Sequence, residues 1–259
     1  MSYQPRRSIV TGASSGIGAE FARALAARGS DLVLVARRTD RLRALASELE
    51  AAHGIRAEVV TADLSKPGAG RALRAELDGT IDTLVNNAGF GAHGPVAEED
   101  PETLERLVAV DVTAVVDLTR AFLPELLEAG HGAIVTIAST AGFQPVPLMA
   151  AYGAAKAFVL SFSQALWQEC RPHGVKVLAL APGFTTTEFF DVAGNADSAH
   201  GAEQTPAQVV ATGMRALDRR RTPPYAVSGL VNAAGAALSP IAPRRLTLAT
   251  VERMMRLRA

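Results

Sequence analysis

The sequence has very little cysteine, few aromatic residues and no excess of charge of either sign. Cys170 is its only cysteine, so no disulfide can form within the chain, and we expect a reducing, cytoplasmic location. Aromatic residues make up 5% of the 259 residues and apolar residues 48% in total, which leaves alanine, leucine and valine to pack helices on a parallel sheet. Lys and Arg together number 26, as do Asp and Glu, so net charge favours neither a nucleic acid nor an anionic membrane as partner.

Several motifs are absent as well. No HxxxH pair or clustered carboxylate pattern accompanies the five histidines, so we expect no metal centre. No GxSxG nucleophile elbow is present, which argues against a serine hydrolase. Segment 222–243 carries no charge, but its prolines make it a poor spanning helix, and no secretory signal precedes the first apolar run. We therefore expect no integral membrane segment.

Short apolar runs alternate with longer helical patterns over the first two-thirds of the chain. This alternation predicts βα units and a parallel sheet, hence one doubly wound α/β domain of the Rossmann type over residues 1–259. We expect strands at 8–11, 31–35, 56–61, 82–86, 133–139 and 175–181, and helices at 16–28, 40–52, 101–129, 150–171 and 206–219. Residues 184–205 lack periodicity and suggest a substrate loop. The role of the extension 222–259 stays open; its basic, apolar part, 244–258, suits a packed helix or a membrane-surface helix.

A glycine-rich run, TGASSGIG at 11–18, follows the first expected strand. Its spacing is GxxxGxG, and glycines at such a turn let the backbone approach a pyrophosphate beside a helix N-terminus. A tight turn without a ligand is the alternative. As candidate ligand-binding residues we take Gly12, Ser14, Ser15, Gly16, Ile17 and Gly18.

The end of the second expected strand bears on the choice of cofactor. An NAD site usually has an acidic residue here, whereas this strand runs into Arg37. A guanidinium group suits a 2′-phosphate, so we expect NADP(H) in preference to NAD(H). We interpret Arg38 and Arg41 as exposed arginines that begin the next helix. The ends of the third and fourth strands add the candidates Asp63, Leu64, Asn87, Ala88 and Gly89.

Tyr152 and Lys156 stand four residues apart in a helical pattern, with Ser139 upstream at the end of a strand. Residues at i and i+4 share one face of a helix, so an ammonium group there would lower the tyrosine pKa. Such a tyrosine exchanges protons with a carbinol oxygen. Beside a bound nicotinamide, this arrangement indicates a carbonyl reductase.

As a set, these residues resemble the short-chain dehydrogenase/reductase family over about residues 6–190. TGASSGIG, NNAG at 86–89, Ser139, the YxxxK of Tyr152 and Lys156, and Pro182-Gly183 follow the family's order. The resemblance implies a seven-stranded parallel sheet, Tyr152 as acid or base, Ser139 as the group that polarises the carbonyl, and Lys156 on the cofactor ribose. It also implies a homodimer or homotetramer, and contacts to the nicotinamide or phosphates from Pro182, Gly183, Thr185 and Thr187.

One position departs from the family pattern. Asp111 stands where many members carry an asparagine whose main-chain carbonyl holds a water linked to the lysine. A buried carboxylate needs a partner or a raised pKa, and Lys156 is the nearby cation. We expect Asp111 to belong to the catalytic group and to alter its pH dependence; the alternative is that it weakens catalysis.

The substrate and two rival functions remain to be weighed. The residues expected to flank the cleft are mostly apolar, which favours a hydrophobic ketone or aldehyde as small-molecule substrate; they are Phe90, His93, Phe143, Pro145, Leu148, Met149, Phe184, Phe189 and Phe190. A nucleotide-sugar epimerase or dehydratase would have a larger C-terminal domain. A non-enzymatic NADP(H)-responsive sensor is the second rival, against which the intact Ser139, Tyr152 and Lys156 argue.

Overall fold

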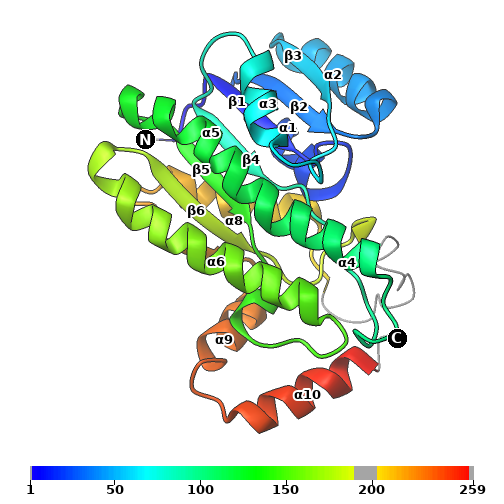
Figure 1. The fold of residues 1–259 in the computed structure, drawn as a ribbon. Coiled ribbons are helices and arrows are strands. Elements are labelled where there is room, and N and C mark those ends of the chain that lie inside the picture. Colours follow the sequence, from blue (N-terminus) through cyan, green and yellow to red (C-terminus); the bar gives the residue numbers. More distant parts are fainter. Residues whose placement is uncertain (1, 190–202, 257–259) are drawn as a thin grey trace.

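Seven parallel strands form one sheet at the centre of the molecule (Figure 1). The computed structural model describes residues 2–189 and 203–256. The strand order is β3-β2-β1-β4-β5-β6-β7. Their bounds are β1 (Arg7–Thr11), β2 (Asp31–Ala36), β3 (Ala57–Thr61), β4 (Thr83–Asn86), β5 (Ala133–Ile137), β6 (Lys176–Ala181) and β7 (Tyr225–Val227). The predicted doubly wound α/β fold is confirmed.

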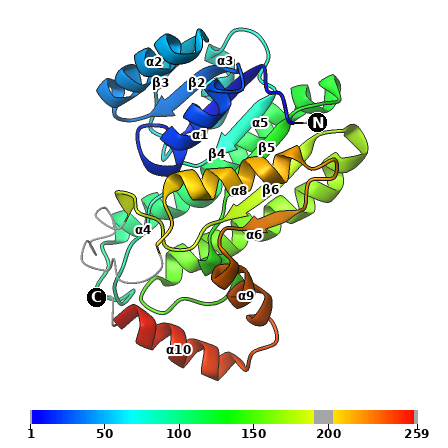
Figure 2. The ribbon, with the colours of Figure 1, turned by 180° about the vertical axis from the view of Figure 1, so that it is seen from behind.

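Helices cover both faces of the sheet, because alternate strand residues point to opposite sides. Val10 of β1 packs with α1 (Gly16–Ala26), α2 (Thr39–His53) and α8 (Pro206–Asp218), which are seen in front in Figure 2. Its neighbour Ile9 packs with α3 (Ala69–Glu76), α5 (Ala114–Ala129) and α6 (Ala150–Cys170) on the other face. The strands are apolar on both faces, as expected for a buried parallel sheet.

The order of the strands reverses beside β1. The chain runs outward from β1 to β2 and β3, then returns to β4 on the other side of β1 and continues to β7. At such a switch point the loops that leave adjacent strands diverge, and a crevice opens beyond the carboxyl ends of the strands. The fold therefore gathers the segments after β1, β2, β4 and β5 at one edge.

The long helix expected at 101–129 is interrupted. It consists of α4 (Pro101–Val108), a π-helical turn at Ala109–Thr113, and α5. A π turn accommodates an extra residue within a helix and often occurs at functional sites. Here the turn contains Asp111, which is completely buried. A periodicity argument could not have located this turn, because the apolar pattern continues through it.

The C-terminal extension contains α9 (Leu230–Leu238) and α10 (Arg244–Arg256), which lie beyond the sheet on the side of its carboxyl ends (Figures 1 and 2). Val251 and Met255 of α10 are buried against Val146 and Met149, so this segment is a packed helix. In the part of the chain that the structure describes, every helix is too short or too polar to cross a membrane.

Candidate active site

A cavity of about 610 Å³ lies at the carboxyl edge of the sheet. It brings together segments from the whole length of the chain, including Ser139, Tyr152 and Lys156. Fifteen of the predicted cofactor-site residues also line it: Gly12, Ser14, Ser15, Gly16, Ile17, Arg37, Asp63, Leu64, Asn87, Ala88, Gly89, Pro182, Gly183, Thr185 and Thr187. Two predicted site residues, Gly18 and Asp111, are not part of the lining and act from behind it.

The glycines after β1 are required by close contacts. Gly12 and Gly16 have positive φ values of 65° and 55°. A Cβ atom on Gly16 would lie 2.9 Å from the side chain of Thr187, which also lines the cavity. A Cβ on Gly18 would lie 2.4 Å from the Gly12 carbonyl oxygen, so Gly18 permits close packing of the turn. The exposed backbone at the start of α1 suits a pyrophosphate.

Asn87 fixes the turn after β1 to the end of β4. Its side-chain amide donates to the Thr11 carbonyl oxygen at 2.8 Å, and the Thr11 hydroxyl accepts from the backbone N–H of Asn87 at 2.9 Å and of Ala88 at 3.0 Å. These bonds hold the two strand ends in register. The structure thus gives Asn87 a positioning role, and Gly89 leaves room for Asp111, because a Cβ on Gly89 would lie 2.6 Å from Asp111 Oδ1.

Arginines gather where β2 ends. Arg37 and Arg38 both line the cavity, and Arg38 donates to the hydroxyl oxygens of Ser14 and Ser15 at 3.0 and 2.7 Å. The same guanidinium pairs with the Glu188 carboxylate at 2.6 Å. Arg38 is exposed and stands at the start of α2, as expected from the sequence, and it also faces the cavity. Cationic and hydroxyl donors at this point fit a phosphorylated ribose.

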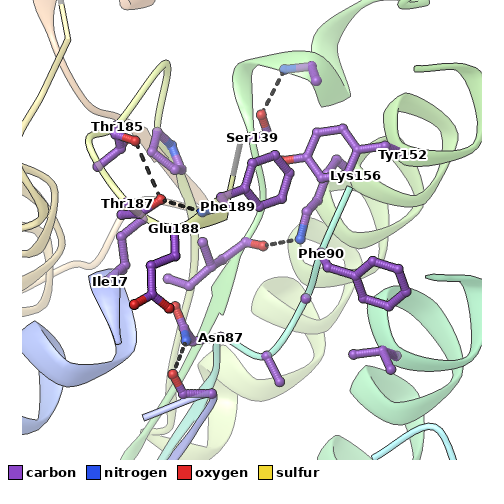
Figure 3. A pocket seen from close by; sticks show the side chains of 18 of the residues that line it. Ile17, Asn87, Phe90, Ser139, Tyr152, Lys156, Thr185, Thr187, Glu188 and Phe189 are labelled. Atoms are coloured by element: carbon purple, nitrogen blue, oxygen red, sulfur yellow. Dashed lines mark hydrogen bonds between the residues drawn. The ribbon is translucent and has the colours of Figure 1, made fainter. Parts of the chain in front are cut away.

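Lys156 stands in a buried ion pair with Asp111. Figure 3 shows the lysine beside the catalytic tyrosine candidate, Tyr152. Its ammonium group lies 2.9 Å from Asp111 Oδ1 and donates to the Ile137 carbonyl oxygen at 3.1 Å. Asp111 Oδ2 accepts from the backbone N–H of Phe90 at 3.0 Å. The ammonium lies 5.6 Å from the centroid of the Tyr152 ring. The expected partnership of Asp111 with Lys156 is thus a direct contact.

Burial dominates the electrostatics of this group. Burial raises the pKa of Tyr152 above its ordinary value, although Lys156 and the hydrogen bond with Ser139 lower it; Asp111 raises it further. Lys156 does favour the phenolate, as predicted, but its effect is outweighed. Burial disfavours the Lys156 ammonium, yet Asp111 and Tyr152 raise its pKa overall. Burial also raises the pKa of Asp111.

The far end of the cavity is apolar. The Phe189 ring lies 5.1 Å from the Tyr152 ring, and Phe90, Met149 and Phe184 also line the space. Three further apolar residues come from α10, which the sequence did not connect with the site: Val251, Met254 and Met255. Four other pocket candidates are not in the lining, namely His93, Phe143, Pro145 and Leu148, while Phe190 lies outside the described residues.

Residues 6–197 match the sequence profile described as short chain dehydrogenase. The chain belongs to the short-chain dehydrogenase family. It is 32% identical over 238 residues to a very-long-chain 3-oxoacyl-CoA reductase of Bos taurus, a match that covers 89% of this chain and 75% of the relative. Short-chain dehydrogenases interconvert carbonyls and alcohols with a nicotinamide cofactor, so this chain is an oxidoreductase, and a purely sensory role is disfavoured.

Two solved structures extend the likeness. A short-chain dehydrogenase from Sphingobium yanoikuyae in complex with NADPH has a TM-score of 0.83 and 38% identity, with 95% of each chain covered. A bulky-bulky ketone specific alcohol dehydrogenase from Comamonas testosteroni has a TM-score of 0.77 and 31% identity, with 93% of this chain and 96% of that chain covered. Both coverages include the C-terminal extension in large part.

The sequence motifs identified many residues of the cavity, but the sequence analysis did not assign Arg38, Glu188 or α10 to it. Arg38 stood beside the predicted Arg37, and their adjacency was the available signal. In α10, the apolar pair Val251 and Met255 at i and i+4 indicated a buried face, without saying what it faced. Glu188 gave no signal, because its partners lie about 150 positions away in the sequence.

Proposed function

We propose that this short-chain dehydrogenase is an NADP(H)-dependent reductase of hydrophobic ketones or aldehydes, with Tyr152 as proton donor. The observation that carries the proposal is the position of Tyr152, which lines one cavity together with Ser139 and has the Lys156 ammonium 5.6 Å from its ring, at the point where the polar and apolar halves of that cavity meet. The polar half would hold the cofactor and the apolar half the substrate.

When bound in the polar half of the cavity, a reduced nicotinamide would supply a hydride, with its electron pair, to the carbonyl carbon. Ser139 donates a hydrogen bond to the carbonyl oxygen and so orients it beside the Tyr152 hydroxyl. Tyr152 gives its proton to that oxygen as negative charge develops there. Lys156 stabilises the resulting phenolate until a proton from solvent restores it. In the reverse direction the Tyr152 phenolate accepts the alcohol proton.

The preference for NADP(H) rests on the arginines at the end of β2. Asp63 follows the end of β3. Hydrogen bonds from Ser65 lower the pKa of its carboxyl group, and Arg37 lowers it further. An ionised carboxylate at this strand end is suited to accept a hydrogen bond from the adenine amino group. Arg37, Arg38 and Ser14 then offer donors to a 2′-phosphate. The NADPH complex of the Sphingobium protein supports this assignment.

A hydrophobic substrate follows from the apolar lining contributed by Phe189, Met149 and α10. The two named relatives act, by their descriptions, on a very-long-chain 3-oxoacyl-CoA and on ketones with two bulky substituents. Both substrates are ketones with large apolar parts. We propose the same chemical class for this protein.

We further propose that the protein is a cytoplasmic homodimer or homotetramer. Apolar side chains that are partly exposed lie on successive helices of one layer: Val108 on α4, Val116 on α5 and Phe158 on α6. A two-fold axis would bring this face against itself and cover them.

The test follows NADPH absorbance with purified enzyme and a panel of hydrophobic ketones, with NADH and Tyr152→Phe as the two comparisons. Turnover that is faster with NADPH and disappears in the variant, while NADPH binding persists, supports the proposal. Equal rates with NADH would reject the cofactor preference. Turnover by the Tyr152→Phe protein at the parent rate would reject the role of the tyrosine.

A further inference from the structure

Glu188 ties the segment after β6 to the arginines at the cofactor end of the cavity. Its two carboxylate oxygens accept from Arg38 at 2.6 Å and from Arg41 at 2.5 Å. We propose that Glu188 is an internal counter-ion of the 2′-phosphate site: NADP(H) must displace its carboxylate from Arg38, so Glu188 limits the preference for NADP(H) over NAD(H). This inference rests on the proposed function of the same site.

The contacts of Arg38 leave few of its donors for a phosphate. Its Nε and one Nη donate to the hydroxyls of Ser14 and Ser15, and its other Nη donates to Glu188. All three nitrogens of the guanidinium are therefore engaged within the protein. A dianionic phosphate at Arg38 would stand beside the Glu188 carboxylate, and two anions so close repel each other.

Glu188 is ionised near neutral pH. Hydrogen bonds from Arg38 and Arg41 lower the pKa of its carboxyl to about 2. It cannot avoid the repulsion by taking up a proton near neutral pH. The exchange must therefore occur by movement of the carboxylate.

The ion pairs of Glu188 are exposed enough to solvent for a phosphate to replace its carboxylate at Arg38. The side chains of Glu188, Arg38 and Arg41 are 41%, 43% and 51% exposed. Pairs at such exposure are weak, and solvent can replace either partner. Thr187, the preceding residue, lies close to Gly16 and, in Figure 3, beside Ile17, so movement of Glu188 would also open the segment that covers the pyrophosphate turn.

The consequence is a difference between two classes of ligand. A nucleotide with a 2′-phosphate must break the Glu188 pairs before it binds, whereas one with a free 2′-hydroxyl leaves them in place. Removing the charge of Glu188 should therefore favour the first class alone. An alternative role, in which Glu188 clamps the segment over any dinucleotide, predicts weaker binding of both classes.

Calorimetry with adenosine 2′,5′-bisphosphate and with AMP tests this without nicotinamide or turnover. We expect Glu188→Gln to bind the bisphosphate about threefold to tenfold more tightly than the parent, which corresponds to the loss of one or two exposed ion pairs. AMP affinity should change by less than about twofold. NADPH and NADH, followed by fluorescence, should repeat the two results.

Two variants serve as controls. Glu203, like Glu188, lies between β6 and α8, and it forms no ion pair within the described part of the chain. Glu203→Gln removes an equal charge and should change the affinity for neither the bisphosphate nor AMP. Arg38→Gln should weaken the bisphosphate and leave AMP unchanged. Equal effects of Glu188→Gln on all four ligands, weaker binding of the bisphosphate, or no effect would overturn the inference. A parent protein that binds neither NADPH nor NADH would instead reject the proposed function.

Discussion

Replacement of Asp111 by asparagine should move the pH profile of catalysis to lower pH. The substitution removes the carboxylate charge beside Lys156 and keeps a side-chain oxygen that can still accept from the ammonium. Asp111 raises the pKa of Tyr152 and offsets the opposing effect of Lys156. Without it, the ammonium acts on the tyrosine uncompensated, and the Tyr152 pKa falls.

The direction of the shift follows from the geometry. Lys156 lies 5.6 Å from the tyrosine ring centroid, and Asp111 contacts Lys156 at 2.9 Å. At an effective dielectric constant of about 20, two unit charges about 4 Å apart interact by about 4 kcal/mol, and the interaction falls in inverse proportion to their distance, so the Asp111 charge acts on the tyrosine through space. We expect the Tyr152 pKa to fall in the variant. Alcohol oxidation requires the phenolate, so its rate rises with pH through this pKa; carbonyl reduction requires the phenol and declines through it.

The assay is a pH series of kcat for oxidation and for reduction, with Asp40→Asn as control because Asp40 is exposed at the start of α2. The rise of the oxidation rate with pH and the decline of the reduction rate should both move to lower pH in Asp111→Asn and should not move in the control. A thermal melt is needed beside it, since loss of one partner of a buried pair costs about 3–5 kcal/mol. If the two pH dependences stay in place or move to higher pH in a folded variant, Asp111 does not raise the pKa of Tyr152. A variant faster than its parent at every pH would show instead that Asp111 weakens catalysis.

Two further predictions concern packing. Gly18→Ala would place a Cβ 2.4 Å from the Gly12 carbonyl oxygen. It should lower the free energy of unfolding by about 1–3 kcal/mol and weaken NADPH binding. Gly235 lies in an exposed part of α9 where a Cβ would meet nothing within 4 Å, so Gly235→Ala should be neutral or stabilising in the same denaturation series. If both variants changed the free energy of unfolding equally, the contact between the new Cβ and the Gly12 carbonyl oxygen would not be the cause. Met254→Ala should raise KM for a bulky ketone by several-fold and leave NADPH affinity unchanged, because Met254 lines the apolar half of the cavity; an unchanged KM would separate α10 from the substrate.

The sequence predicted the parts of this protein that depend on local pattern. Six strands lie within two residues of their expected bounds, because apolar runs in a buried parallel sheet are distinct from the amphipathic helices between them. The seventh, β7, has three residues behind two prolines, too few for a pattern to register. The glycine turn, Tyr152, Lys156 and Ser139 were found because each motif is short and contiguous.

The features that were missed depend on contacts between distant segments. Glu188 meets Arg38 only after β6 has been placed in the sheet, and α10 reaches the cavity only by folding back over Met149. The raised pKa of Tyr152 had the same origin: sequence spacing gives its distance from Lys156 but not the burial that outweighs the ammonium.

The central claim is that a hydride passes from the nicotinamide to a carbonyl carbon while Tyr152 supplies the proton. NADPH deuterated at the transferring position of C4, incubated with a bulky ketone and the enzyme, tests it by mass spectrometry of the alcohol. The account predicts one deuterium on the carbinol carbon with the parent enzyme and no alcohol with Tyr152→Phe. Alcohol that carries no deuterium, or labelled alcohol formed as fast by the variant, would contradict it.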